Sequence, residues 1–124
     1  MIQTNHNLKD ALDKYILALD KREYFLAHEI LEEAWHPLRI SKSPLANLLK
    51  GMINASIAFE HIKRDRAKAK SKAQKVIKAY DRYKGIDKII YKKEFEDAIL
   101  KIDMIRDRLL PKGEDYSSSS LSSS

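Results

Sequence analysis

The stretch of residues 23–35 constrains the fold of this chain more than any other part of the sequence. It contains no Gly or Pro, and its apolar residues recur at helical spacing around most of the helix circumference. A helix that is apolar on most sides is typically buried. His28 and Glu32 then lie one turn apart, in the middle of a face that should exclude water. Because buried polar groups need partners, this pair predicts an internal network or a functional site.

Two helices are expected before residue 44. The first has an apolar stripe over residues 8–19, with Asn5 or Asn7 as its N-cap, and should end near Lys21 or Arg22. The central helix, which begins at about residue 23, should end at His36-Pro37, because proline disfavours helical backbone in the residue before it.

The third helix is expected from about Pro44 to about Lys63. Ser43 is a suitable N-cap, and proline is common at the first helical position. Gly51 belongs to a stripe of mostly small residues, which would let a neighbouring helix approach closely and explain a glycine inside a helix. Polar residues run beside this stripe, next to the expected contact with the central helix. They are Asn47, Lys50, Asn54 and His61.

Two more helices complete the expected fold. Residues 63–84 are strongly basic but keep a helical apolar period, and Gly85 is a usual residue just after a helix end. A fifth helix over residues 95–109 should stop at Pro111 and Gly113. The sequence therefore predicts one compact all-α domain over residues 1–113, an orthogonal or partly open bundle of about five helices. The Ser-rich residues 114–124 are expected to be a disordered tail.

Composition narrows the classes of protein to which the chain can belong. Its 124 residues suit one domain, and 44% apolar and 34% charged residues suit a soluble protein. Cys is absent, which excludes disulfides and thiol chemistry and fits a cytoplasmic location. No long uncharged apolar run predicts a membrane span, and no signal peptide is expected at the N-terminus. The net charge of +6 favours acidic partners only mildly.

The candidate site combines two helices. One interpretation is structural: Glu32 accepts a hydrogen bond from a histidine, and the network holds the helix pair in register. The other is a divalent-metal site with His28, Glu32 and His61 as ligands and Glu29 as a catalytic base. Lys50 would either neutralise Glu32 or lie at the surface. The candidate residues are His28, Glu29, Glu32, Trp35, Asn54 and His61.

The residues around His28 resemble a known family, the "domain of unknown function 309". The shared pattern is Tyr-Phe-x-Ala-His-Glu-x-x-Glu-x-x-Trp over residues 24–35, followed by Gly51 and by His61 near the end of an apolar helix. Lys50 stands where the family usually has Gln, and residues 63–66 replace a typical Arg-Gly-Asn turn. The resemblance implies a compact all-helical domain found in prokaryotes, and it implies no particular reaction.

Three functions follow as hypotheses. The first is a structural or small-ligand-binding module built on the His/Glu/Trp cluster. The second is a metal-assisted hydrolase that uses the candidate ligands named above. The third is nucleic-acid binding through the basic residues 63–84, which requires those charges to share one face. Homo-oligomerisation is left open by the sequence.

Overall fold

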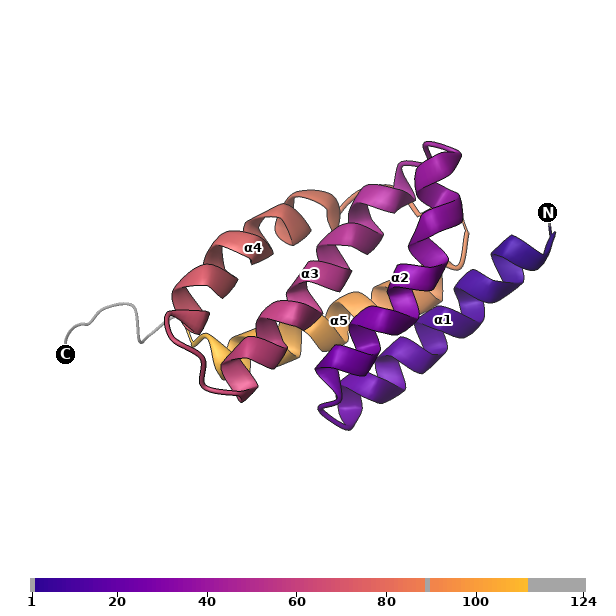
Figure 1. Cartoon of the computed structure of the whole chain (residues 1–124). Helices are drawn as coiled ribbons and strands as arrows, with labels where there is room; N and C mark the ends of the chain where they lie inside the picture. The colour runs from indigo at the N-terminus through magenta and orange to yellow at the C-terminus, as the bar shows by residue number, and fades with distance from the viewer. Residues whose placement is uncertain (1, 89, 112–124) are drawn as a thin grey trace.

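The computed structural model describes residues 2–88 and 90–111, and only the backbone of residues 2–7. These residues form five helices and no strand (Figure 1). The predicted all-α class is therefore confirmed, whereas Gly113 and the predicted tail over residues 114–124 lie outside the described residues. The helices are α1 (Ile2–Asp20), α2 (Tyr24–Ile40), α3 (Leu45–Lys63), α4 (Ala69–Tyr83) and α5 (Lys92–Leu109).

Successive helices from α1 to α4 pack side by side, and each runs roughly opposite to the one before it (Figure 1). α5 crosses behind this row and contacts α1 and α3. The central position of α3 explains its apolar character, since it has neighbours on three sides. Burying each of its large apolar side chains contributes about 1.5–3 kcal/mol. Its largest buried side chains are Leu45, Leu48, Leu49, Met52, Ile53 and Phe59.

The central helix α2 differs from its prediction in two ways. Helix continues through Pro37 to Ile40, so the expected end at His36-Pro37 is wrong. Only one turn follows the proline, and that turn is held by the buried Leu38 and by a hydrogen bond from the Ser41 N–H to the Pro37 carbonyl (3.1 Å). The helix is also not buried all round, because Phe25 is 51% exposed. Tertiary packing on one face of α2 has outweighed the local preference.

The other boundaries are close to the predicted ones. α1 begins at Ile2, before both of its expected caps, and ends at Asp20, one or two residues earlier than expected. α3 begins one residue after Pro44, with the Leu45 N–H donating to the Ser43 hydroxyl (3.2 Å). α4 is shorter than the basic segment of the sequence, since residues 64–68 form a turn before it.

Helices α1, α2 and α3 end in the same way, although none has a glycine there. Arg22, Lys42 and Asp65 each adopt the left-handed conformation, with φ of 60°, 60° and 55°. In each case the next residue donates a backbone hydrogen bond to a carbonyl five residues earlier, as when the Ser43 N–H bonds to the Leu38 carbonyl (3.0 Å). This is the usual hydrogen-bond pattern of a helix C-terminus, which glycine adopts at least cost.

Gly51 marks a close approach of α3 and α4. A Cβ atom at Gly51 would lie 2.9 Å from the Cα of Tyr80, which is too close for a non-bonded pair. The expectation that the small stripe admits a neighbouring helix is thus confirmed at this residue, and the helix that approaches is α4. The buried Tyr80 hydroxyl donates to Asp103 of α5 (2.9 Å), which connects α4 to α5.

A second buried hydroxyl pair connects α1 to α3. The Tyr15 hydroxyl lies 2.8 Å from the Ser56 hydroxyl and donates to the Met52 carbonyl (3.1 Å), and both side chains are fully buried. Burial raises the pKa of Tyr15 well above its usual value, although the hydrogen bond with Ser56 acts in the opposite direction. The phenol therefore stays protonated and available as a donor.

Within the described residues, no helix is long and apolar enough to cross a membrane.

Candidate functional site

His28 lies on the side of α2 that faces α3 and is half-buried, with 16% of its side chain exposed. Its Nδ1 lies 2.7 Å from the Phe25 carbonyl, and a carbonyl can only accept, so Nδ1 carries the hydrogen. Its Nε2 is 3.7 Å from Glu32 Oε1, which is too long for a direct hydrogen bond. The predicted one-turn pairing is therefore present, but as a loose contact.

Glu32 forms the centre of a small charged row at the surface between α2 and α3. Its other oxygen is 3.9 Å from Lys50 Nζ, and 37% of its side chain is exposed. Lys50 Nζ also lies 4.3 Å from the centre of the Trp35 ring, and the Arg39 guanidinium lies 5.0 Å from it, both within cation–π range. Lys50 thus lies beside Glu32, as expected if it neutralises this carboxylate. The face that was expected to be dry is in contact with water.

The predicted internal network is not formed. Among the residues that the structure describes, no hydrogen bond joins Glu32 to Asn54, to His61 or to the Trp35 indole. His61 instead accepts a hydrogen bond at Nδ1 from Arg66 (2.9 Å), because a guanidinium has only donors. Hydroxyl contacts between helices are made instead by the fully buried Tyr15 and Tyr80.

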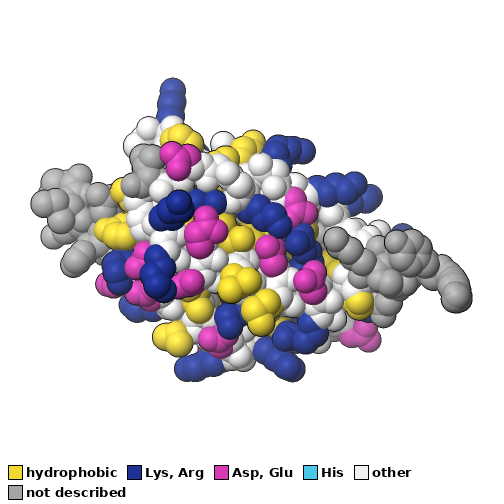
Figure 2. Space-filling model, turned by 180° about the vertical axis from the view of Figure 1, so that it is seen from behind, with side chains coloured by type: hydrophobic (Ala, Val, Ile, Leu, Met, Phe, Trp, Pro, Cys, Tyr) yellow, Lys and Arg dark blue, Asp and Glu magenta, His cyan; other side chains and the backbone are white. Residues whose placement is uncertain are grey.

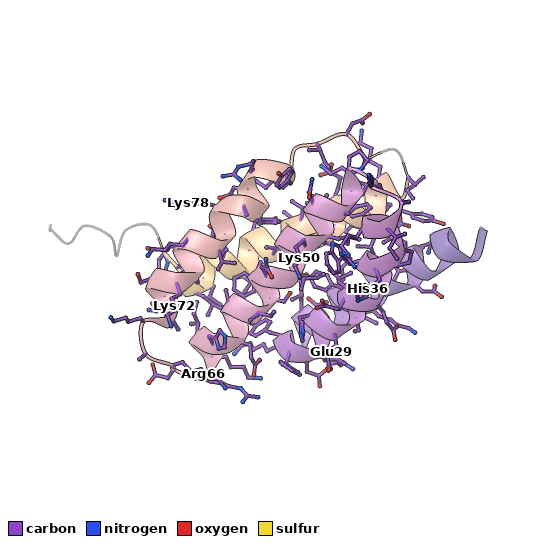
Figure 3. All side chains as sticks on the ribbon, turned by 45° about the horizontal axis from the view of Figure 1, so that its top comes forward. Glu29, His36, Lys50, Arg66, Lys72 and Lys78 are labelled. Carbon is purple, nitrogen blue, oxygen red and sulfur yellow. The ribbon has the colours of Figure 1, made fainter. Side chains whose placement is uncertain are left out.

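The structure does not assemble the proposed metal ligands either. The described residues contain no group of three or more His, Cys, Asp or Glu side chains that could hold a metal ion. His61 directs Nδ1 to Arg66, and Glu29 lies exposed on the outer side of α2 (Figure 3). The hydrolase hypothesis therefore lacks its ligand set in this structure.

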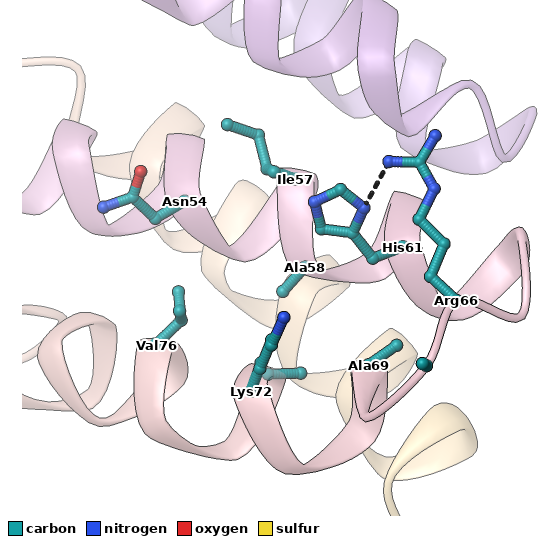
Figure 4. A pocket seen from close by; sticks show the side chains of 10 residues that line it. Asn54, Ile57, Ala58, His61, Arg66, Ala69, Lys72 and Val76 are labelled. Carbon is teal, nitrogen blue, oxygen red and sulfur yellow. Dashed lines mark hydrogen bonds between the residues drawn. The ribbon is translucent and has the colours of Figure 1, made fainter.

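A pocket of about 430 Å³ lies between α3 and α4, at the end of the pair away from the Gly51–Tyr80 contact (Figure 4). Its floor is apolar, and four nitrogen-bearing side chains stand around it: Asn54, His61, Arg66 and Lys72. The Lys72 side chain extends from α4 toward α3, and His61 stands at the rim between Ile57 and Arg66 (Figure 4). Among the described residues, no Asp or Glu lines it. The lining residues of the floor are Ile57, Ala58, Ala69, Ala73 and Val76.

A smaller cavity of about 230 Å³ adjoins this pocket on the side of α2. His28 and His61 both line it, and Ile57, His61 and Arg66 belong to both cavities. The structure therefore brings the two predicted histidines to one cavity. The hydrogen-bonded pair of His61 and Arg66 separates this cavity from the larger pocket. Asn54 lines only the larger pocket, and Glu32 lines neither.

The sequence did not single out Arg66 and Lys72. Both lie in the basic segment, where a cation is usually just part of a solvated surface. Their positions beside His61 depend on the turn of residues 64–68, which folds α4 back along α3. Two residues of this turn, Asp65 and Lys68, adopt the left-handed conformation, which neither composition nor periodicity predicts.

Comparison with known proteins gives one result. No curated protein matches the chain, and no solved structure does. The family described as "Domain of unknown function (DUF309)" matches residues 12–72, which contain α2, α3 and the turn with Arg66. Over this part of the chain, the resemblance read from the sequence is confirmed, and the chain is similar to the Domain of unknown function (DUF309) family.

Proposed function

We propose that this chain is a small-ligand-binding module, and that the pocket between α3 and α4 binds an amphipathic anion. Such a ligand has an apolar body and one carboxylate, sulfonate or phosphate group. The observation that carries the proposal is the make-up of the pocket wall, which combines an apolar floor, nitrogen donors at the rim and no acidic residue. A volume of about 430 Å³ also falls in the usual range for small-molecule pockets, about 300–1,000 Å³.

Each rim residue has a defined part in this proposal. Arg66 presents the guanidinium N–H groups that it does not donate to His61, and these suit the oxygens of an anion. Since His61 accepts at Nδ1, its neutral form carries hydrogen on Nε2 and has that N–H to donate. Lys72 adds a positive charge on the opposite wall, from α4. The ligand body would then rest on the alanines and Val76 of the floor.

The smaller cavity extends the proposed site toward α2. His28 lines it with Nε2 free of a direct hydrogen bond, so this histidine can accept from a polar group on a longer ligand. In this proposal the row of Glu32, Lys50 and Trp35 borders the site and does not contact the ligand. The absence of Cys supports a cytoplasmic location, and the family resemblance supports a prokaryotic source.

Isothermal titration calorimetry with naphthalene-2-sulfonate and its neutral analogue naphthalene-2-methanol tests the proposal. The sulfonate should bind more tightly than the alcohol, and Lys72→Gln should weaken sulfonate binding about tenfold, the effect of one charge-assisted hydrogen bond. Lys75→Gln is the matched control, because Lys75 is on the same helix and does not line the pocket. Equal binding of the two compounds, or equal effects of the two variants, would refute the proposal.

A further inference from the structure

The positive charge of this protein is concentrated in one segment. Residues 66–82 contain seven Lys or Arg and a single Asp, so their formal charge of +6 equals that of the whole chain. The rest of the chain has a formal net charge of zero. The segment covers α4 and the turn before it, and Figure 3 labels Arg66, Lys72 and Lys78 along it.

Three of these cations lie on the outer face of α4, and a fourth, Lys68, directly precedes the helix. Taking 100° per residue, Lys75, Lys78 and Arg82 fall within an arc of about 60°. This arc is opposite the buried side of the helix, which carries Ala73, and all four cations are exposed. The row spans about 20 Å at the rise of an α-helix.

These four cations are not neutralised by the protein. None of them forms an ion pair with another residue of the described chain. The single acid of α4, Asp81, is already engaged with Arg106 of α5 (2.7 Å) and with Lys84 (3.2 Å). The face seen from behind is different, since Asp and Glu lie among Lys and Arg there (Figure 2). Lys101, for example, pairs with Asp20 at 2.6 Å.

From this arrangement we infer that the outer face of α4 binds the phosphate backbone of double-stranded nucleic acid, without sequence specificity. Phosphates at regular spacing are the natural complement of a straight row of unpaired cations. Lys68, Lys75, Lys78 and Arg82 together form this surface, the α4 face.

Two other polyanions fit the α4 face less well. Insertion into an anionic membrane needs exposed apolar side chains, and all the large exposed apolar side chains of the described residues lie on other helices. Single strands are held by stacking on exposed aromatic rings, whereas Tyr80 is buried and Tyr83 is half-buried. A protein partner would need apolar or aromatic anchors, which this face also lacks.

Fluorescence anisotropy with a short labelled DNA duplex, and with an RNA duplex of the same sequence, tests the inference over about 50–200 mM KCl. With four phosphate contacts, the logarithm of the association constant for DNA should fall with the logarithm of salt concentration at a slope of about −3.6. The double variant Lys75→Gln/Lys78→Gln should lower the affinity and reduce the slope by about 2. Binding to RNA as well as to DNA is expected, because the contacts are to the backbone.

The control is Lys14→Gln/Lys92→Gln, which removes the same charge from exposed lysines on α1 and α5 that have no ion pair in the described chain. It should keep the wild-type slope. Equal loss in both double variants would overturn the inference, because net charge alone would then explain binding. Tighter binding to oligo(dT), or to phosphatidylserine vesicles, than to the duplex would also overturn it. Since Lys75 and Lys78 do not line the pocket, this test is independent of the proposed ligand site.

Discussion

Gly51 of α3 lies against the backbone of Tyr80 of α4, so closely that a Cβ atom at Gly51 would be 2.9 Å from the Tyr80 Cα. This contact fixes the spacing of the two helices near the start of α3. The pocket lies farther along the same pair, where four of the ten lining residues are alanines, whose small side chains leave space between the helices. The helix spacing set at Gly51 therefore bears directly on the proposed binding site.

Substitution Gly51→Ala should destabilise the protein by up to about 2 kcal/mol. Overpacking against rigid backbone costs about 1–3 kcal/mol, and the better helix propensity of alanine recovers roughly 1 kcal/mol of this. Gly85→Ala is the control, because nothing lies within 4 Å of a Cβ there and its φ is not positive. Urea denaturation should show a lower midpoint for Gly51→Ala and an equal or higher midpoint for Gly85→Ala. Equal midpoints would contradict the close approach.

Substitution Tyr15→Phe should cost about 1–2 kcal/mol, because it removes the hydroxyl that donates to the Met52 carbonyl and lies within hydrogen-bond distance of Ser56. Ser56→Ala should cost about 1 kcal/mol. A double-mutant cycle measured by urea denaturation should give a coupling of at least 0.5 kcal/mol, as is typical of residues in one network. Additive effects of the two substitutions would mean that the hydroxyls do not interact. Tyr83→Phe should be neutral, since this half-buried hydroxyl has no hydrogen bond within the described residues.

Periodicity predicted the helices well and the polar contacts poorly. The spacing of His28 and Glu32 placed them one turn apart, and the structure agrees, since both depend on α2 alone. The hydroxyl of Tyr15 could not be paired with Ser56 from sequence, because the two residues are 41 positions apart and meet only through the packing of α1 on α3. The same limit applies to Lys72, whose place beside His61 depends on how α4 returns along α3.

The path of α2 shows a second limit. Local preference placed the helix end before Pro37, but one further turn is held by the burial of Leu38 on the core. The exposure of Phe25 has a related cause. A helix wheel that is apolar on most sides predicts complete burial, but α2 packs mainly against α1 and α3, which leaves Phe25 at the surface. Neither the number of neighbours nor their positions can be read from one helix.

Substitution Lys42→Gly should stabilise the protein by about 0.5–1 kcal/mol. Lys42 adopts a left-handed conformation (φ 60°) after α2, and glycine enters this region without the steric penalty of a Cβ atom. Ser41→Gly in the same turn is the control, since Ser41 has helical angles (φ −79°, ψ −1°) and gains nothing from glycine. Thermal melts should rank Lys42→Gly above the wild type and Ser41→Gly at or below it. A lower melting temperature for Lys42→Gly would contradict the assigned turn.

The ion pairs of Asp81 should make stability depend on acidic pH. Burial acts to raise the pKa of Asp81, but hydrogen bonds from Arg106 and Lys84 outweigh it and lower the pKa below the usual 3.8. The unfolded chain therefore takes up the proton first, and this contribution to stability, present above about pH 3.8, is lost as the pH falls through the lower folded value. Thermal melts between neutral and acidic pH should show a shallower acid decline for Asp81→Asn. Asp97→Asn, in an exposed pair with Lys93, should keep the wild-type decline.

The ligand site itself can be located by two-dimensional ¹H–¹⁵N NMR during titration with naphthalene-2-sulfonate. Saturable chemical-shift changes are expected in residues 54–61 of α3 and in residues 66–76 of the turn and α4. The largest changes are expected at the His61 and Arg66 amides. Val76→Trp, which fills the pocket from its half-buried edge, should abolish these shifts and leave the rest of the spectrum in place. Shifts confined to other surfaces, such as the exposed Leu100 and Met104 of α5, or no saturable shifts at all, would contradict the central claim.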